Sequence, residues 1–170
     1  MAQNMGKVFL YNEITGSTSP LIKLLKRNTG VPIFRGEICK FGGTYMAPLA
    51  ADEAMDSVLA VCNEEIRSVD PLGYYEFIIP RVGDVFEYPL VTPSALAWNA
   101  PLYASSTGYS QVLTPTPGTN IIGYSCADDN IPHQQTVRSG NGNKGSTLET
   151  VSTAKFTFVS ASSYWDVIYR

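Results

Sequence analysis

The sequence predicts a mainly β protein: a single compact domain of the β-sandwich or barrel-like (β-tulip) type, with an N-terminal arm and one or two short helices. The chain has 170 residues, which is enough for one domain with a hydrophobic core. In its second half, turn signals recur about every eight to twelve residues, and the apolar runs between them are short. No room is left for the helices of a parallel βαβ sheet, so we expect short antiparallel strands.

The N-terminal part is expected to differ from the rest: residues 1–30 as an arm with a short helix, and residues 31–170 as the β-rich domain. The segment "KVFLYNEI" (7–14) predicts either a first strand or an arm that becomes ordered on a neighbouring molecule. The segment "SPLIKLLKRNTG" (19–30) predicts a short helix. Its serine can cap the helix, its proline suits the first helical position and its last glycine can end it. The helix would dock through its apolar face.

The rest of the chain is predicted to consist mainly of strands. The segment "VPIFRGEICKF" (31–41) alternates apolar and polar residues, as a half-buried strand does. Residues 52–66 have two interpretations, a helix capped by Asp52 or a loop followed by the strand "SVLAVCNEEI" (57–66), and the short continuous apolar run favours the strand. Further strands are predicted within 74–80, 84–90, 101–106, 109–113, 120–127 and 149–160, with a Gly-rich loop at 138–147.

Charged residues make up 16% of the chain, and the net charge is −3. So low a share is typical of a surface that partners cover, or of a β surface that uses Ser, Thr and Asn in place of charge. Residues 1–40 carry six basic and two acidic residues, a balance of +4, whereas residues 41–87 carry two basic and nine acidic residues, a balance of −7. Because no aromatics interleave the basic residues, no nucleic-acid partner is expected. A head-to-tail electrostatic contact between copies is an alternative.

No catalytic, cofactor or metal site is predicted, and therefore no enzyme. Cys39, Cys62 and Cys126 are too widely spaced for a metal-ligand pattern and are expected to be small buried side chains in a reducing compartment. His133 is the single histidine, expected in a loop with no nucleophile motif near it. The N-terminus shows no signal-peptide pattern and no run is apolar over the length of a membrane helix, so we expect synthesis in the cytoplasm and no membrane partner.

A long uncharged stretch carries the main functional signal. Between Glu87 and Asp128 the sequence contains no Asp, Glu, Lys, Arg or His. Most catalysis needs proton donors and acceptors, whereas an interface benefits from their absence, because burying an unpaired charge is costly. The aromatic residues Trp98, Tyr103 and Tyr109 of this stretch are therefore predicted to contact another subunit.

Residues 31–130 resemble the head-decoration, or capsid-cement, proteins of tailed bacteriophages. The resemblance lies in an Arg-Gly strand ("FRGEICKF", 34–41), a "PLAAD" stretch (48–52) and an apolar strand that ends in acidic residues ("SVLAVCNEEI", 57–66). A "PLY" strand, a Gly turn and an "IGY" strand then follow in the order found at the end of cement proteins. The basic N-terminal segment and the residues after 130 lie outside the resemblance.

The resemblance implies a non-enzymatic structural protein, usually a homotrimer, that binds the outer surface of the major capsid protein lattice and stabilises the head. The protein would be made in the host cytoplasm and would end in the virion, with no cofactor. Its N-terminal arm would contact the capsid or a neighbour, through the candidate residues Val8, Phe9, Leu10, Tyr11, Leu21, Leu24 and Leu25. The alternative is a β-module of a phage tail or fibre that binds a host glycan or another virion protein.

Overall fold

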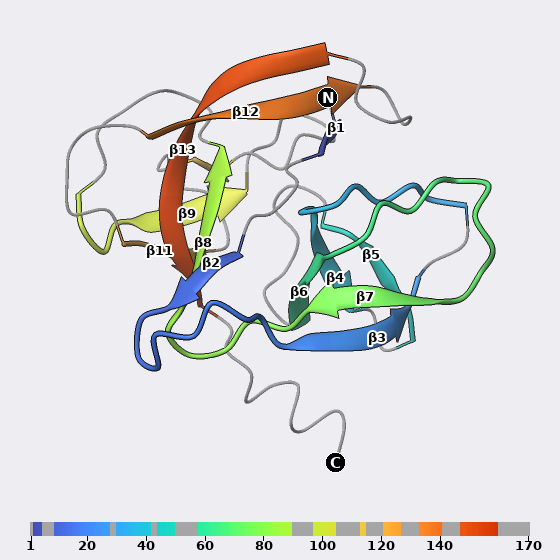
Figure 1. Cartoon of the computed structure of the whole chain (residues 1–170), viewed down its shortest axis with the longest axis horizontal. Coiled ribbons are helices and arrows are strands. Elements are labelled where there is room, and N and C mark those ends of the chain that lie inside the picture. The colour runs from blue at the N-terminus through green and yellow to red at the C-terminus, as the bar shows by residue number, and fades with distance from the viewer. Residues whose placement is uncertain are drawn as a thin grey trace.

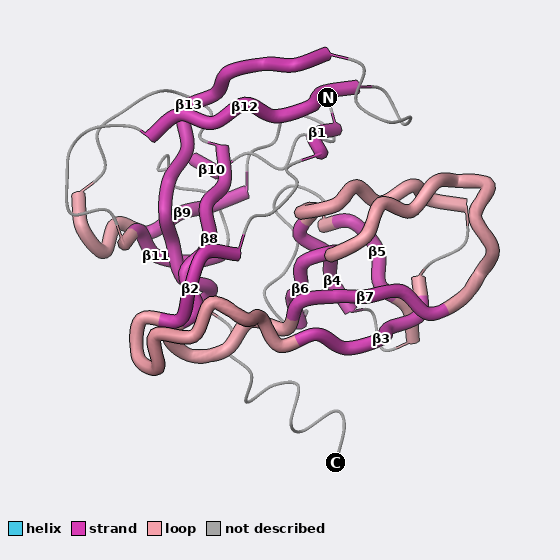
Figure 2. The backbone as a smooth tube through the Cα atoms, viewed as in Figure 1, coloured by secondary structure: helices cyan, strands magenta, loops and turns pink. Residues whose placement is uncertain are grey.

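The computed structural model describes residues 2–4, 9–27, 30–41, 44–49, 58–89, 97–104, 113–114, 121–126, 133–140 and 147–159. Within these ranges the regular structure consists of strands without an α-helix. The strands form two sheets whose ladders are all antiparallel, and they lie side by side in Figure 1 and Figure 2. The mainly β prediction is therefore confirmed. No helix of the described part of the chain is long and apolar enough to cross a membrane.

The larger sheet has eight strands. Its main path runs in the order β1-β12-β13-β11-β9-β10, while β8 pairs with β13 and β2 pairs with β8. The long strand β13 holds it together, pairing with β12 along its first half and with β8 and β11 along its second half. The strands are β1 Ala2–Asn4, β2 Phe9–Asn12, β8 Asp84–Pro89, β9 Pro101–Ala104, β10 Leu113–Thr114, β11 Ile121–Ser125, β12 His133–Gly140 and β13 Thr147–Phe158.

The smaller sheet has five strands in the order β3-β7-β6-β4-β5. An isolated bridge between Arg27 and Met46 brings its two outer strands, β3 and β5, next to each other. The sheet therefore curls toward a closed barrel, which has an inside and an outside. The strands are β3 Ile22–Lys26, β4 Ile38–Phe41, β5 Met46–Pro48, β6 Val58–Cys62 and β7 Tyr74–Ile78.

Two hydrophobic cores follow from this arrangement, because successive side chains of a strand point to opposite faces. On β6, Leu59 and Val61 belong to the core between the two sheets, whereas Ala60 and Cys62 belong to the core inside the barrel. The core between the sheets consists of Phe9, Ile38, Leu59, Val61, Ile78, Phe86, Tyr88, Leu102, Ile122 and Phe156. The core inside the barrel consists of Leu25, Ile33, Cys39, Met46, Ala60, Cys62, Ile66, Phe77 and Ile79.

Aromatic rings make up much of the core between the sheets. The Phe9 and Phe86 ring centroids lie 5.6 Å apart and those of Phe86 and Phe158 lie 5.0 Å apart, both with edge-to-face geometry. Tyr88 packs against Phe156 in the same way at 5.5 Å. Such pairs each add about 1 kcal/mol beyond the area that they bury. The N-terminal strand β2 and the C-terminal strand β13 are thereby packed on β8, although they are far apart in the sequence.

The helix predicted within 19–30 is wrong: Ile22–Lys26 is the strand β3. It pairs with β7 along its whole length. Its Leu25 is buried, whereas Ile22 and Leu24 are exposed. A helix of two to three turns is marginal in water, so the ladder with β7 and the burial of Leu25 override the local helix signals. Gly30, which was predicted to end the helix, instead lies in a turn after β3 and adopts a left-handed φ of 73° there.

The prediction of an arm separate from the β-rich domain fails for β2 and β3. Phe9 is 1% exposed in the core between the sheets, and Leu25 is 3% exposed in the core inside the barrel. Removing residues 1–30 would therefore remove two strands, β1 and β2, from the larger sheet and one strand, β3, from the smaller sheet. A deletion cannot separate attachment from folding in this chain, and point substitutions are needed instead.

Several other predicted strands are confirmed, including β6 in the ambiguous region, β7, β8, β9, β11 and β13. The strand predicted at 31–41 is shorter, because a turn at Arg35–Gly36 precedes β4. His133 begins β12 and does not lie in a loop, and the loop predicted at 138–147 is wrong at residues 138–140, which belong to β12. Residues 52–57, 105–112 and 141–146 lie outside the described residues.

The two connections that cross between the sheets, β2 to β3 and β7 to β8, are joined by a buried polar network. The Asn12 side chain donates to Asp84 Oδ1 at 2.8 Å, and Arg81 Nε donates to Asp84 Oδ2 at 3.1 Å. Arg81 also donates to the carbonyl of Ser19 at 2.8 Å. Because Asn12 and Asp84 are almost fully buried, these bonds are strong and fix the relative position of the two crossings.

Candidate protein interaction surface

The outward side of the larger sheet collects aromatic side chains from separate strands. On β9, Leu102 points into the core, so its neighbours Pro101 and Tyr103 point away from the core. The strand register places Tyr103 opposite Ile121, and places Tyr124 between Pro101 and Thr157. We call this surface the tyrosine face, made of Pro101, Tyr103, Ile121, Tyr124 and Thr157. Pro101 is exposed and the other four are half-buried.

A bulge in β11 makes this arrangement possible. Ile121 pairs with Tyr103 and Gly123 pairs with Leu102, so two residues of β11 face one residue of β9. Ile122 therefore belongs to the core, Gly123 also lies on the core side, and Tyr124 turns outward. Without the bulge, simple alternation would place Ile122 and Tyr124 on the same face of the sheet.

Trp98 lies on a turn directly before β9 and is 69% exposed. Two backbone hydrogen bonds fasten this turn to β11: Asn99 N–H donates to the Ser125 carbonyl at 2.8 Å, and Ser125 N–H donates to the Ala100 carbonyl at 2.8 Å. Asn99 has a left-handed φ of 60°, which asparagine tolerates better than most residues. Because the turn is already ordered, binding through Trp98 would cost little backbone entropy.

Charge lies at one side of the tyrosine face. The register places Lys155 of β13 opposite Glu87 of β8, and both are half-buried. Pro101, Tyr103 and Tyr124 carry no formal charge, and they belong to the uncharged stretch of the sequence. A partner could therefore cover the aromatic part without removing water from a charged group, which is the expensive step in forming many interfaces.

Of the three predicted inter-subunit residues, Trp98 is exposed on the turn before β9 and Tyr103 is half-buried on β9. Tyr109 lies outside the described residues. Tyr124 was not singled out from the sequence, and the bulge explains why alternation alone would miss it.

The seven predicted N-terminal contact residues do not form one surface. Phe9 and Leu25 are core residues, so their side chains are not available to a neighbour in this fold. Tyr11 and Leu24 are exposed, but they lie on different sheets. Leu10 and Leu21 are half-buried, and Val8 lies outside the described residues.

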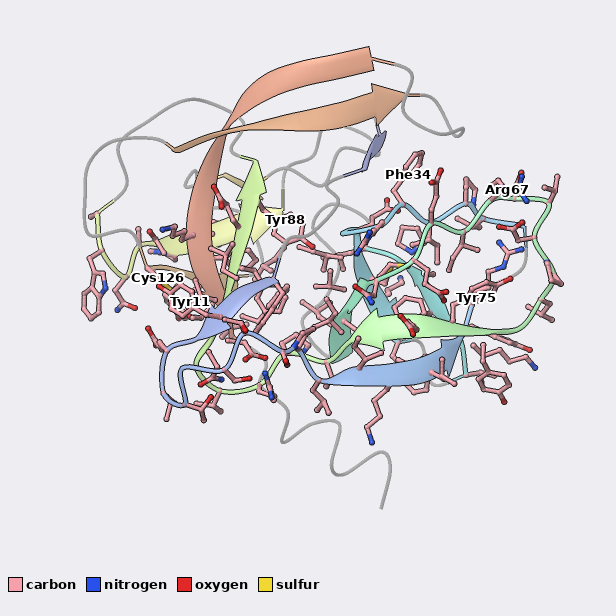
Figure 3. The ribbon with its side chains drawn as sticks, in the orientation of Figure 1. Tyr11, Phe34, Arg67, Tyr75, Tyr88 and Cys126 are labelled. Carbon is pink, nitrogen blue, oxygen red and sulfur yellow. The ribbon has the colours of Figure 1, made fainter. Side chains whose placement is uncertain are left out.

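A second cluster of functional interest lies buried where the two sheets meet. Tyr88 of the larger sheet, labelled in Figure 3, donates its hydroxyl proton to the carbonyl of Gly36, which lies just before β4 of the smaller sheet. Glu37 is 3% exposed, and its Oε2 accepts the backbone N–H of Phe34 at 2.8 Å. Burial raises the pKa of Glu37 to about 7, although the bond from Phe34 acts in the opposite direction.

The thiols of Cys39 and Cys62, near this cluster, are unreactive because burial disfavours their ionised form. Burial raises the pKa of Cys62 to about 12, and burial, together with the charges of Cys62 and Glu37, raises the pKa of Cys39 well above its usual value. Burial likewise raises the pKa of the Tyr88 hydroxyl. Because a thiol must ionise to act as a nucleophile, Cys39 and Cys62 are structural. Their predicted burial is confirmed, whereas Cys126 is half-buried.

Within the described ranges, no group of three or more His, Cys, Asp and Glu side chains is arranged to hold a metal ion. The adjacent acids Asp128 and Asp129, whose carboxylate oxygens are of the type that binds calcium, lie outside those ranges. No protein-family model, curated protein or solved structure matches the chain significantly. The candidate functional residues are therefore those of the tyrosine face, Trp98 and the buried cluster around Glu37.

Proposed function

We propose that this chain is a non-enzymatic structural protein of a virion, which binds the outer surface of a major capsid protein lattice and assembles with its own copies, as a homotrimer. The exposure of Trp98 on an ordered turn that leads directly into β9 of the tyrosine face carries the proposal. The resemblance of residues 31–130 to capsid-decoration proteins supports the choice of a capsid as the partner.

The residue types of this surface favour a protein partner. Trp and Tyr are enriched in protein interfaces and supply most of the residues that dominate binding energy, because they bury a large area while keeping a polar tip. Tyr103 and Tyr124 come from adjacent strands and lie on the same outward side of the sheet, so one partner can contact both. On a repeating lattice, even modest affinity at each site adds up through many simultaneous contacts.

Replacing Trp98 with alanine is expected to weaken attachment to capsid shells by at least about 30-fold, equivalent to about 2 kcal/mol, the loss typical of a central interface aromatic. Stability should change little, because the side chain is mostly exposed. The measurement is co-sedimentation with empty heads of the source virus, together with the mass in solution by light scattering. Val69→Ala is the matched control, since Val69 is 80% exposed and lies on the smaller-sheet side.

The two variants separate the outcomes. A trimer that pellets with shells and loses this property only in Trp98→Ala supports the proposal. A wild-type monomer that stays in the supernatant contradicts it, and equal binding by Trp98→Ala and Val69→Ala would show that Trp98 does not contact the capsid. Leu24→Ala then asks whether the exposed leucine of β3 contributes to attachment.

The second candidate function is a tail or fibre module that binds a host glycan. It is favoured by the exposure of Trp98 and Asn99, which follow each other on the same turn, since an aromatic ring and a neutral hydrogen-bonding group suit an uncharged sugar. Binding of the wild-type protein on a glycan array, lost in Trp98→Ala, would support this function. An array without any binding would end it.

A further inference from the structure

The buried Glu37 cluster occupies the joint between the two sheets. Residues Ile33 to Glu37 lead into β4, and Ile33 pairs with Ile66 through a bridge. Gly36 receives the hydroxyl hydrogen bond of Tyr88, which comes from the other sheet. Two further backbone bonds hold the same segment: Gly36 N–H donates to the Cys62 carbonyl at 2.7 Å, and Cys62 N–H donates to the Glu37 carbonyl at 2.9 Å.

Three described titratable groups that interact electrostatically with Glu37 are poor partners for a negative charge. Cys39 comes from β4, Cys62 from β6 and Tyr88 from β8, and all three are neutral acids near pH 7. Neither the Arg67–Asp70 ion pair nor the Arg81–Asp84 ion pair includes Glu37. The N–H of Phe34 is the hydrogen-bond donor that the carboxylate has from its own segment.

We propose that Glu37 is a proton-controlled joint between the two sheets: its neutral carboxyl group keeps the segment 33–37 closed against Tyr88, and its ionised form loosens that segment. The physical cause is desolvation, because a carboxylate in a nearly dry site loses its hydration without gaining a cation. Opening the segment would return the charge to water. The proposal is independent of the proposed capsid function and can be tested on the purified protein alone.

The direction of the pH effect follows from the difference between the pKa of Glu37 in the closed state and its pKa in the open state. The pKa of Glu37 is about 7 in the closed state, compared with an ordinary value of 4.5 when the carboxyl group is solvated. The closed state therefore binds the proton more tightly, so its stability is complete below about pH 4.5 and is lost as the pH rises through 7. With a Glu37 pKa of about 7 in the closed state and 4.5 in the open state, the ratio of closed to open molecules falls about tenfold between about pH 6 and pH 8.

Hydrogen exchange measures this opening directly. The amides of Gly36 and Cys62 are the reporters, because their hydrogen bonds hold the segment closed. The Cys126 amide is the internal reference, since it donates to the Lys155 carbonyl in the larger sheet. After correction for the intrinsic rates, protection of the two reporters should fall about tenfold from about pH 6 to pH 8, while that of the reference changes much less. Equal behaviour of all three amides would overturn the proposal.

The variant Glu37→Gln removes the titration and keeps an oxygen that can accept the Phe34 N–H. Its reporter amides should keep the same protection at about pH 6 and pH 8, whereas Glu13→Gln, a change at an exposed glutamate, should retain the wild-type response. If Glu37→Gln does not fold, carbon-13 NMR of the wild-type glutamate carboxyl groups decides. A Glu37 midpoint near 7 supports the proposal, and a midpoint near the ordinary value overturns it.

Discussion

Gly123→Ala is expected to lower the free energy of unfolding by about 3 kcal/mol or more, and in the extreme to prevent the larger sheet from forming. A Cβ atom at this position would lie 2.1 Å from the Thr157 carbonyl oxygen and 2.7 Å from Cδ2 of Phe156. Neither neighbour can move cheaply. The Thr157 oxygen is backbone of β13, which pairs with β11, and the Phe156 ring is fully buried. Even one methyl group would force the central strands apart.

Gly73→Ala is the matched control, because its Cβ would have no heavy atom nearer than 3.9 Å. We expect it to stay within about 0.5 kcal/mol of the wild type. Denaturant unfolding followed by circular dichroism compares the two variants at the same pH. If both were equally stable, β11 and β13 could not be as close as the structure places them, and the bulge that directs Tyr124 outward would also be in question.

Arg27→Met is expected to lower the free energy of unfolding by about 3 kcal/mol. The Arg27 side chain is 1% exposed at the end of the barrel and donates to the carbonyls of Val31, Arg67 and Asp70. One guanidinium group thus links the segment after β3 to the segment before β7. Methionine can replace its apolar stem, but the three carbonyls would lose a charged donor in a place that water reaches poorly.

Two further variants test this explanation. Arg67→Met removes an exposed arginine that pairs with Asp70, and the change in stability should be small, because exposed ion pairs contribute little. Arg27→Lys keeps the positive charge but loses the planar set of donors, so its stability should fall between the wild type and Arg27→Met. A chain in which Arg27→Met and Arg67→Met are equally stable would show that the guanidinium group does not hold the two segments together.

The predictions that came directly from local patterns were successful where one pattern dominated. The run at Val58–Cys62 is short, continuous and apolar, and it forms a strand that is buried on both faces. Clean alternation in the last long segment likewise predicted most of β13. The strand β3 shows the limit of this reasoning, because its capping signals are those of a helix and its partner β7 lies about fifty residues further along the chain.

The candidate sites divide in the same way. The sequence by itself determined the uncharged aromatic stretch, and with it the choice of Trp98 and Tyr103 as surface residues. Only the tertiary structure placed Tyr124 on the same outward side of the sheet as Tyr103, because a bulge shifts the register of β11 against β9. Glu37 is the clearest case. In the sequence it is an ordinary polar residue of an alternating segment, and it becomes a buried acid because Tyr88 and Cys62 arrive from distant strands and exclude water from it. Alternation and turn signals are local properties, whereas burial and pKa depend on which distant strands pack together.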